Sequence, residues 1–167
     1  MKKRSPGELL VELRIVRNRL ERDLAKLDRR INALHSMAVQ SFPTVPALSQ
    51  RVMKEVDQLE RVRANLMKLS VLLEMLELRL ETVLTLNAMF GELRPVVKAV
   101  RELSKSFPVP LEVAPDIEGI LSDLAALAVP QHHEPVVQND DSEVKRILEE
   151  AEKIASIKSA KAYIVEG

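Results

Sequence analysis

The stretch Ser41-Phe42-Pro43-Thr44-Val45-Pro46 separates two long leucine-rich segments of the chain. Its two prolines stand within four residues and cannot continue an α-helix, because each lacks a backbone N–H and its ring clashes with the preceding turn. On both sides of the stretch, apolar residues recur at the spacing of three and four that is typical of amphipathic helices. The stretch therefore predicts a turn between two helices.

The segment before the turn has the pattern of one amphipathic helix. Ser5 suits the N-cap, Pro6 the first helical position, and Glu8 completes a capping box. The apolar residues that follow lie on one face of a helix of about 30 residues, roughly 45 Å long at 1.5 Å per residue. This first seam comprises Leu9, Leu13, Val16, Leu20, Leu24, Leu27, Ile31 and Leu34.

The segment after the turn has a second apolar seam, and residues 47–90 contain neither Gly nor Pro. Such a helix could reach roughly 65 Å. Two seams joined by a short turn must bury against each other, which predicts an antiparallel helical hairpin. The second seam comprises Leu48, Val52, Val56, Leu59, Val62, Leu66, Leu69, Leu73, Leu76, Leu80 and Val83, and runs on toward Asn87 and Phe90.

Three shorter helices are predicted after the hairpin. Gly91 and Pro95 mark a break before a third helix at 92–107, and proline-containing linkers precede helices at about 116–129 and 141–163. Four Gly and four aromatic residues in 167 nearly exclude an all-β fold. The expected class is all-α: a long antiparallel hairpin, a short third helix and two smaller tethered carboxyl-terminal helices.

The 25 basic and 25 acidic residues are distributed unevenly along the chain. Residues 1–108 contain 20 basic and 13 acidic side chains, whereas residues 109–167 contain 5 and 12. We therefore expect a basic helical core over 1–108, with hairpin helices at about 8–38 and 47–90, and an acidic regulatory tail over 109–167. This division indicates an anionic partner or an internal electrostatic latch, with two uncoupled solvated halves as the alternative.

Positive charge gathers on the first helix, on the face away from its seam. At ~100° per residue, Arg22, Lys26 and Arg29 lie opposite the seam without acidic neighbours. Each Lys or Arg near an anionic bilayer contributes about 1 kcal/mol, so such a face favours reversible, salt-sensitive membrane binding. An ordinary solvated face is the alternative; nucleic acid is disfavoured because no aromatic residue is there to stack on bases. The candidate membrane-binding residues are Lys2, Lys3, Arg4, Arg19, Arg22, Lys26, Arg29 and Arg30.

Residues that could support catalysis or hold a metal are sparse. There is no glycine-rich phosphate loop and no cysteine. The adjacent His132 and His133 point apart and have no nearby His or Cys to complete a metal shell, so a solvated linker is expected. Glu74, Glu77 and Glu81 lack the Glu-x-x-His pattern of di-iron bundles and indicate an exposed salt-bridged face. We expect no enzyme activity, no catalytic residue, no metal and no cofactor.

The chain also lacks the patterns of membrane insertion. No apolar run approaches the ~18 residues of a membrane span, and the basic opening at residues 1–4 is not followed by the apolar core of a signal peptide. Together with the absence of cysteine, this predicts a soluble cytosolic protein.

The order of the elements resembles that of a known family. The stretch LLEMLELRLETV (72–83) resembles the second helix of the archaeal ESCRT-III proteins, the CdvB-type cell-division subunits. The sequence LRPVVKAVREL (93–103) resembles the region of their third helix, including the proline that opens it. The similarity of layout extends over nearly the whole chain, from the basic amino terminus to the acidic tail with its terminal helix.

The resemblance implies a membrane-remodelling filament subunit of archaeal cell division and no enzyme. Such subunits polymerise with paralogous copies on anionic membranes, and their acidic carboxyl-terminal region folds back to keep them monomeric. A AAA+ ATPase with a MIT domain disassembles the polymer. The implied location is the cytoplasm, with peripheral recruitment to the inner face of the cell membrane at the division site. An elbow at Gly91 and Pro95 would realign the second and third helices between closed and open forms.

The ATPase would grip a short MIM segment in the carboxyl-terminal region. A proline-rich MIM docks as an extended apolar strip in a groove, and the stretch that fits it comprises Val129, Pro130, Pro135, Val136 and Val137. Weaker candidates, at the loose spacing of a helical MIM, are Ile147, Leu148 and Ile154. Two other functions are compatible with the same residues: a soluble coiled-coil scaffold or chaperone, and a nucleoid-associated DNA-binding protein.

Overall fold

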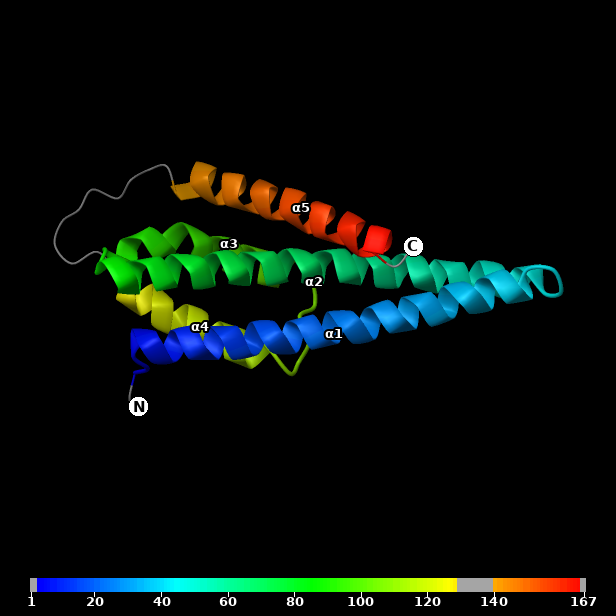
Figure 1. Cartoon of the computed structure of the whole chain (residues 1–167), viewed down its shortest axis with the longest axis horizontal. Helices are drawn as coiled ribbons and strands as arrows, with labels where there is room; N and C mark the ends of the chain where they lie inside the picture. The colour runs from blue at the N-terminus through cyan, green and yellow to red at the C-terminus, as the bar shows by residue number, and fades with distance from the viewer. Residues whose placement is uncertain (1–2, 129–139, 166–167) are drawn as a thin grey trace.

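The computed structural model describes residues 3–128 and 140–165, with the side chains of residues 3–128 and 141–160. Within these residues the chain is all-helical, which confirms the expected fold class (Figure 1). The observed helix ends lie within about four residues of the predicted ones. The elements are α1 (Pro6–Ser41), α2 (Pro46–Leu86), the short 3-10 helix η1 (Phe90–Leu93), α3 (Arg94–Ser106), α4 (Ala114–Leu127) and α5 (Asp140–Val165).

Helices α1 and α2 form the long antiparallel hairpin, joined by the predicted turn (Figure 1). The capping box is present: the Ser5 hydroxyl accepts from the Glu8 N–H, and the Glu8 carboxylate accepts from the Ser5 N–H, both at 3.2 Å. At the turn, the Ser49 hydroxyl donates to the Ala38 carbonyl at 2.7 Å. Seven of the eight residues of the first seam are buried, and the eighth, Leu27, is half-buried.

Two residues assigned to the second seam are exposed instead. Leu48 is 44% exposed, because it lies in the first turn of α2, beyond Ala38, the last buried residue of α1. Val62 is 42% exposed, and its neighbour Arg63 is buried in its place. The buried face of a helix drifts with its 3.6-residue period, and at this turn the inward position falls on Arg63, whose guanidinium pairs with Asp28 of α1.

Helix α2 ends at Leu86, before the predicted end near residue 90. Asn87 adopts the left-handed conformation, with φ 51° and ψ 39°, which Asn tolerates better than most residues at a helix end. The Ala88 N–H donates to the Val83 carbonyl at 3.0 Å and closes the last turn. The break in the helix therefore lies at Asn87, four residues before the glycine that the sequence pattern selected.

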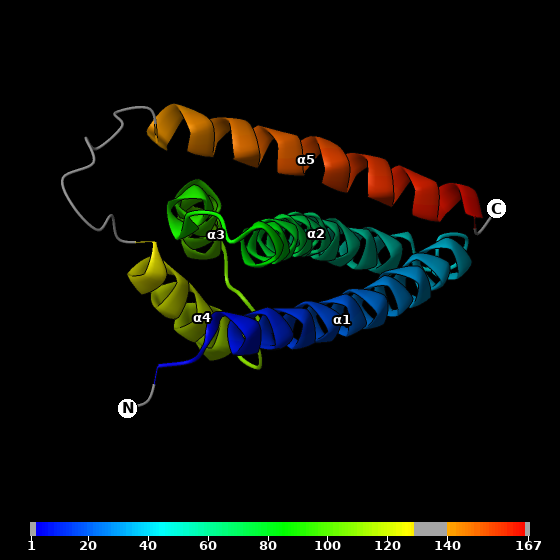
Figure 2. The ribbon, with the colours of Figure 1, turned by 60° about the vertical axis from the view of Figure 1, so that its left-hand side comes forward.

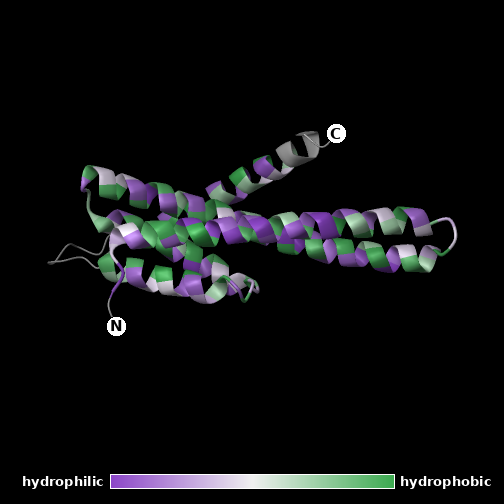
Figure 3. Ribbon diagram, turned by 60° about the horizontal axis from the view of Figure 1, so that its bottom comes forward, coloured by the Kyte–Doolittle hydropathy of each residue, from purple (hydrophilic) through white to green (hydrophobic). Residues whose placement is uncertain are grey.

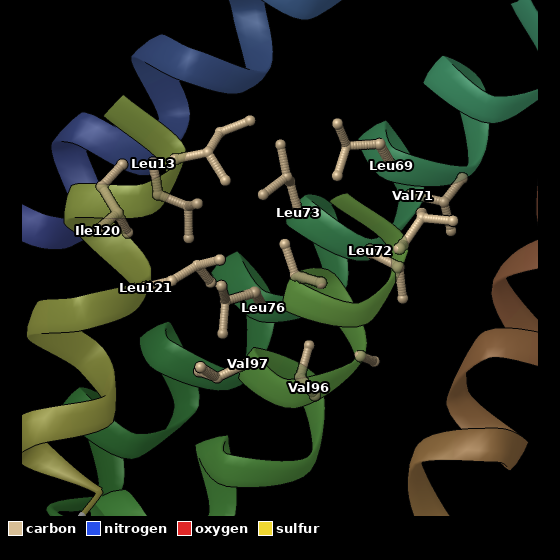
Figure 4. Close-up of a cluster of buried hydrophobic side chains, with 14 of the residues drawn as sticks. Leu13, Leu69, Val71, Leu72, Leu73, Leu76, Val96, Val97, Ile120 and Leu121 are labelled. Carbon is tan, nitrogen blue, oxygen red and sulfur yellow. The ribbon is translucent and has the colours of Figure 1, made fainter. Parts of the chain in front are cut away.

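Helices α3, α4 and α5 gather at the end of the hairpin opposite its turn. Helix α4 lies beside α1, whereas α5 runs over α2 and α3 (Figure 2). Residues 69–73 of α2 are buried all round, as expected of a helix covered on all sides. Figure 4 shows Leu13 of α1, Leu73 and Leu76 of α2, Val97 of α3 and Leu121 of α4 in this core. Both carboxyl-terminal helices therefore contribute to the main core.

The hairpin continues beyond this core as a two-helix arm that ends in the turn (Figure 3). The arm has a small apolar cluster of its own, separate from the main core, formed by Ile31, Leu34, Ala38, Val52 and Val56. None of the helices in the described residues combines the length and the apolar character needed to cross a membrane.

Candidate functional site

The structure divides the candidate membrane-binding residues into two groups. Arg4 and Arg19 are held by carboxylates. Lys3 is exposed near the start of the chain, and Lys2 lies outside the described residues. The remaining four are exposed on α1 and form no ion pair with any described carboxylate: Arg22, Lys26, Arg29 and Arg30.

Helix α4 provides carboxylates for both members of the first group. Arg4 Nε donates to Asp123 Oδ2 at 2.8 Å, and its Nη1 pairs with Glu12 of α1. Arg19 Nη1 donates to Asp116 Oδ2 at 3.1 Å. Hydrogen bonding to Asp123 raises the pKa of Arg4 above its ordinary value, although burial opposes the shift.

Gly119 of α4 leaves space for the Arg4 guanidinium against the surface of the helix. A Cβ at this position would come within 2.9 Å of Arg4 Nη2. The small residue therefore lets the guanidinium lie close to the helix surface, and its role becomes visible only once α4 is placed beside the amino terminus.

The two carboxyl-terminal helices differ in net charge. Helix α4 contains three acidic residues and no basic one, whereas α5 contains six acidic and five basic residues. Of the two carboxyl-terminal helices, α4 is the one that packs against the basic α1. Helix α4 is thus the carboxyl-terminal helix that supplies carboxylates to Arg4 and Arg19, and α5 is close to neutral.

Glu77 is buried, which corrects the expectation of an exposed salt-bridged face at Glu74, Glu77 and Glu81. Its Oε2 accepts from Arg17 Nε at 2.7 Å, and its Oε1 accepts from Arg14 Nε at 3.0 Å. Hydrogen bonding to Glu77 raises the pKa of Arg17 above its ordinary value, against the effect of burial. Two arginines of α1 thus cover the α2 carboxylate and fix the register of the hairpin.

Replacing Glu77 by alanine is expected to lower the free energy of unfolding by about 2 kcal/mol. Removing one partner of a buried ion pair costs 3–5 kcal/mol, but here the arginines can turn partly to water, since the Arg14 side chain is 45% exposed. The matched control is Glu81→Ala: Glu81 reaches Arg14 Nη2 at 3.5 Å with half of its side chain exposed, so the expected loss is below about 0.5 kcal/mol. Urea denaturation of both variants measures the difference, and equal losses would contradict a special role for Glu77.

Arg63 is a second buried charge that the sequence pattern did not indicate. Its guanidinium pairs with Asp28 of α1 and donates from Nη1 to Ser159 Oγ of α5 at 3.1 Å. It therefore connects three helices. Its position four residues after Leu59 is compatible with the buried face of α2 and could have predicted its burial. The sequence pattern instead assigned the neighbouring Val62 to that face, because Val62 is apolar.

Helix α5 contacts both α2 and α3, so it spans the bend between them. Lys158 Nζ donates to Glu74 Oε2 at 2.8 Å on α2, and Lys98 Nζ of α3 donates to Asp141 Oδ1 at 2.9 Å. The helical MIM candidates face this interface: Ile147 is buried and packs with the half-buried Leu148 and Ile154. The extended MIM candidates, Val129, Pro130, Pro135, Val136 and Val137, lie outside the described residues.

The two elbow residues lie just after the bend. Gly91 belongs to η1 and has no positive φ, and a Cβ added to it would meet no atom within 4 Å. Pro95 is buried in the first turn of α3. Neither residue supplies the unusual backbone conformation of the bend, which belongs to Asn87.

The described residues contain no group of three or more His, Asp or Glu side chains that could hold a metal ion. His132 and His133 lie outside them. A cleft of about 440 Å³ opens between α2 and α5 and is lined largely by polar and charged side chains, among them Arg63, Lys68 and Glu152.

Comparison with known proteins finds a similarity over the whole length of the chain. No family model and no solved structure matches the chain. The Cell division protein B3 of Sulfolobus acidocaldarius is 29% identical over 169 residues, which cover 99% of this chain and 99% of that protein. The similarity therefore includes the hairpin and all three shorter helices. With the all-helical fold and the pattern of residues 72–103, it supports the resemblance of the chain to the archaeal ESCRT-III-like proteins of the CdvB type.

Proposed function

We propose that this protein acts in cell division as a filament subunit that assembles on anionic membrane. Similarity over the whole length to a cell division protein supports the role in division. The observation that supports membrane binding is the exposed row on α1 formed by Arg22, Lys26, Arg29 and Arg30, which no described carboxylate neutralises.

Electrostatics sets the expected strength of this binding. At about 1 kcal/mol for each cation near an anionic surface, four residues contribute about 4 kcal/mol, close to a thousandfold in affinity. The Debye length falls from ~10 Å at 0.1 M salt to ~3 Å at 1 M, so the attraction is lost at high salt. Binding of this kind is reversible, as a subunit that cycles on and off a membrane requires.

The observed arrangement corresponds to a closed subunit in this proposal. Helix α4 occupies Arg4 and Arg19, and α5 spans the bend between α2 and α3. Release of α4 would free Arg19 and would leave Arg4 paired with Glu12 of α1 alone. Release of α5 would let an elbow at Gly91 and Pro95 realign the two helices and would uncover the apolar face that neighbouring subunits could occupy.

The remaining parts of the proposal concern partners and location. Copies of this chain and paralogous subunits would form the filament at the inner face of the cell membrane, and a AAA+ ATPase with a MIT domain would disassemble it. The ATPase would grip either the strip from Val129 to Val137 or the residues Ile147, Leu148 and Ile154. Because Ile147 is buried against the core, the second choice requires α5 to leave first.

Co-sedimentation with vesicles across a salt series tests the proposal. We expect the protein to pellet with phosphatidylserine vesicles at low salt and to be released as the salt concentration rises. It should not pellet with phosphatidylcholine vesicles at any salt concentration. Negative-stain electron microscopy of the pellet should show rings, coils or tubulated vesicles. No pelleting at any salt would favour a soluble scaffold, and preferential binding to competing duplex DNA at matched salt would favour a nucleoid protein.

A further inference from the structure

The tip of the hairpin, residues 37–48, exposes a group of large apolar side chains. Phe42 is 63% exposed and Val39 is 61% exposed. Isolated exposed apolar residues are ordinary, but a group of neighbours marks an interaction site. Five of the fourteen large apolar residues that are exposed in the described part of the chain lie within these twelve positions: Met37, Val39, Phe42, Val45 and Leu48.

The tip also lacks negative charge. No Asp or Glu occurs from Arg29 to Lys54, a stretch that contains four Lys or Arg residues. This distinguishes the tip from the exposed apolar residues Leu86 and Met89 at the other end of α2, which are flanked in sequence by Glu81 and Glu92. The tip therefore differs from that end of α2 in having exposed apolar groups without nearby carboxylates in the sequence.

The tip continues the basic face of α1. Arg22, Lys26, Arg29, Ala33 and Met37 follow one another at steps of four, three, four and four residues. At ~100° per residue, Met37 lies within roughly 60° of the centre of the basic row. A surface that binds the cations of α1 would therefore also meet Met37, at the start of the tip.

We infer that the hairpin tip inserts its apolar side chains among the headgroups of an anionic lipid layer. This inference rests on the proposed membrane function and adds a second point of attachment to it. Apolar residues flanked by Lys and Arg suit the interface of an anionic bilayer, which accepts both kinds of group. Arg51 and Lys54 lie three and six residues beyond Leu48, so two tips in contact would bring four such cations together without a carboxylate from residues 29–54 between them, and charge favours lipid over a second copy.

A tryptophan at the tip reports insertion directly, because the chain contains no other. We expect the emission of Phe42→Trp to shift to shorter wavelength on addition of phosphatidylserine vesicles and to be quenched by brominated acyl chains. The matched control is Leu86→Trp, since Leu86 is also exposed, at 71%, but lies at the opposite end of α2. Its emission should stay that of a tryptophan in water.

An aspartate at the same two positions measures the contribution to binding. Phe42→Asp is expected to weaken vesicle binding at least tenfold, whereas Leu86→Asp should leave it within twofold. Both residues are exposed, so helicity by circular dichroism should be unchanged in each variant.

The outcomes separate the tip from the proposed function. Vesicle pelleting with no spectral change in Phe42→Trp would overturn the tip insertion and leave the membrane function standing. No pelleting of the unaltered protein would overturn the membrane function and the insertion with it. A concentration-dependent shift in Phe42→Trp without lipid would assign the tip to a second copy of the chain and overturn the insertion.

Discussion

Simultaneous replacement of Arg22, Lys26 and Arg29 by glutamate is expected to abolish binding to anionic vesicles. Each substitution converts an attraction of about 1 kcal/mol into a repulsion of similar size. The three together shift the binding free energy by about 6 kcal/mol, which is more than a thousandfold in affinity at low salt. Co-sedimentation at 50–100 mM salt measures the loss, and raising the salt should reduce the difference between the variant and the unaltered protein.

The fold should survive this change, because the three side chains are exposed and form no ion pair with a described carboxylate. Helicity and the thermal midpoint are the corresponding checks. A matched control changes the net charge by the same amount elsewhere: Lys145, Arg146 and Lys153 are exposed on α5 and can be replaced by glutamate together. If both triple variants lose binding equally, net charge decides adsorption and the α1 row has no special role. Unaltered binding of the α1 variant would place the lipid contact on another face.

The hairpin follows from local rules, which is why sequence patterns predicted it. The capping box at Ser5 and Glu8 and the proline turn at 41–46 act within a few residues, and the apolar seams repeat at the helical period. The errors arose where tertiary contacts outweigh these rules. Arg63 can be buried because its guanidinium donates hydrogen bonds to Asp28 and Ser159. Glu77 can be buried because its carboxylate accepts hydrogen bonds from two arginines of α1.

The candidate site was predictable only in part for the same reason. The basic row on α1 is a property of one helix, so its periodicity is visible in the sequence. The carboxylates that hold Arg4 and Arg19 lie 119 and 97 residues away along the chain, on α4. No spacing rule connects positions so far apart. The exposed hairpin tip was missed because Leu48 was predicted to be buried as part of the second seam. In the structure, α1 has no residue that covers Leu48, and its side chain is exposed.

Replacing Ile147 by aspartate is expected to release α5 from α2 and α3. Ile147 is 3% exposed in the main core, and a carboxylate buried there without a partner costs several kcal/mol. The polar contacts of α5, such as Lys158 with Glu74, lie at the surface and contribute at most about 1 kcal/mol each. The helix should therefore leave the core, and its amide hydrogens should exchange at least a hundredfold faster, which corresponds to about 3 kcal/mol of lost protection.

The matched control for this variant is Ile157→Asp. It makes the same substitution on the same helix at a position that is 55% exposed, so the exchange of α5 should stay close to that of the unaltered protein. Retained protection of α5 in Ile147→Asp would contradict the view that the burial of Ile147 in the main core is what chiefly holds α5 in place.

Release of α5 should also act on the elbow, because α5 contacts the helices on both sides of it. The chain has no cysteine, so Arg61→Cys on α2 and Lys105→Cys on α3 allow two spin labels to be attached at exposed positions. When α5 is released by Ile147→Asp, the distribution of distances between the two labels should broaden. The affinity for anionic vesicles should rise. One unchanged distance in free and vesicle-bound protein would exclude an elbow. A free α5 without stronger binding would instead assign the restraint to α4, whose carboxylates still hold Arg4 and Arg19.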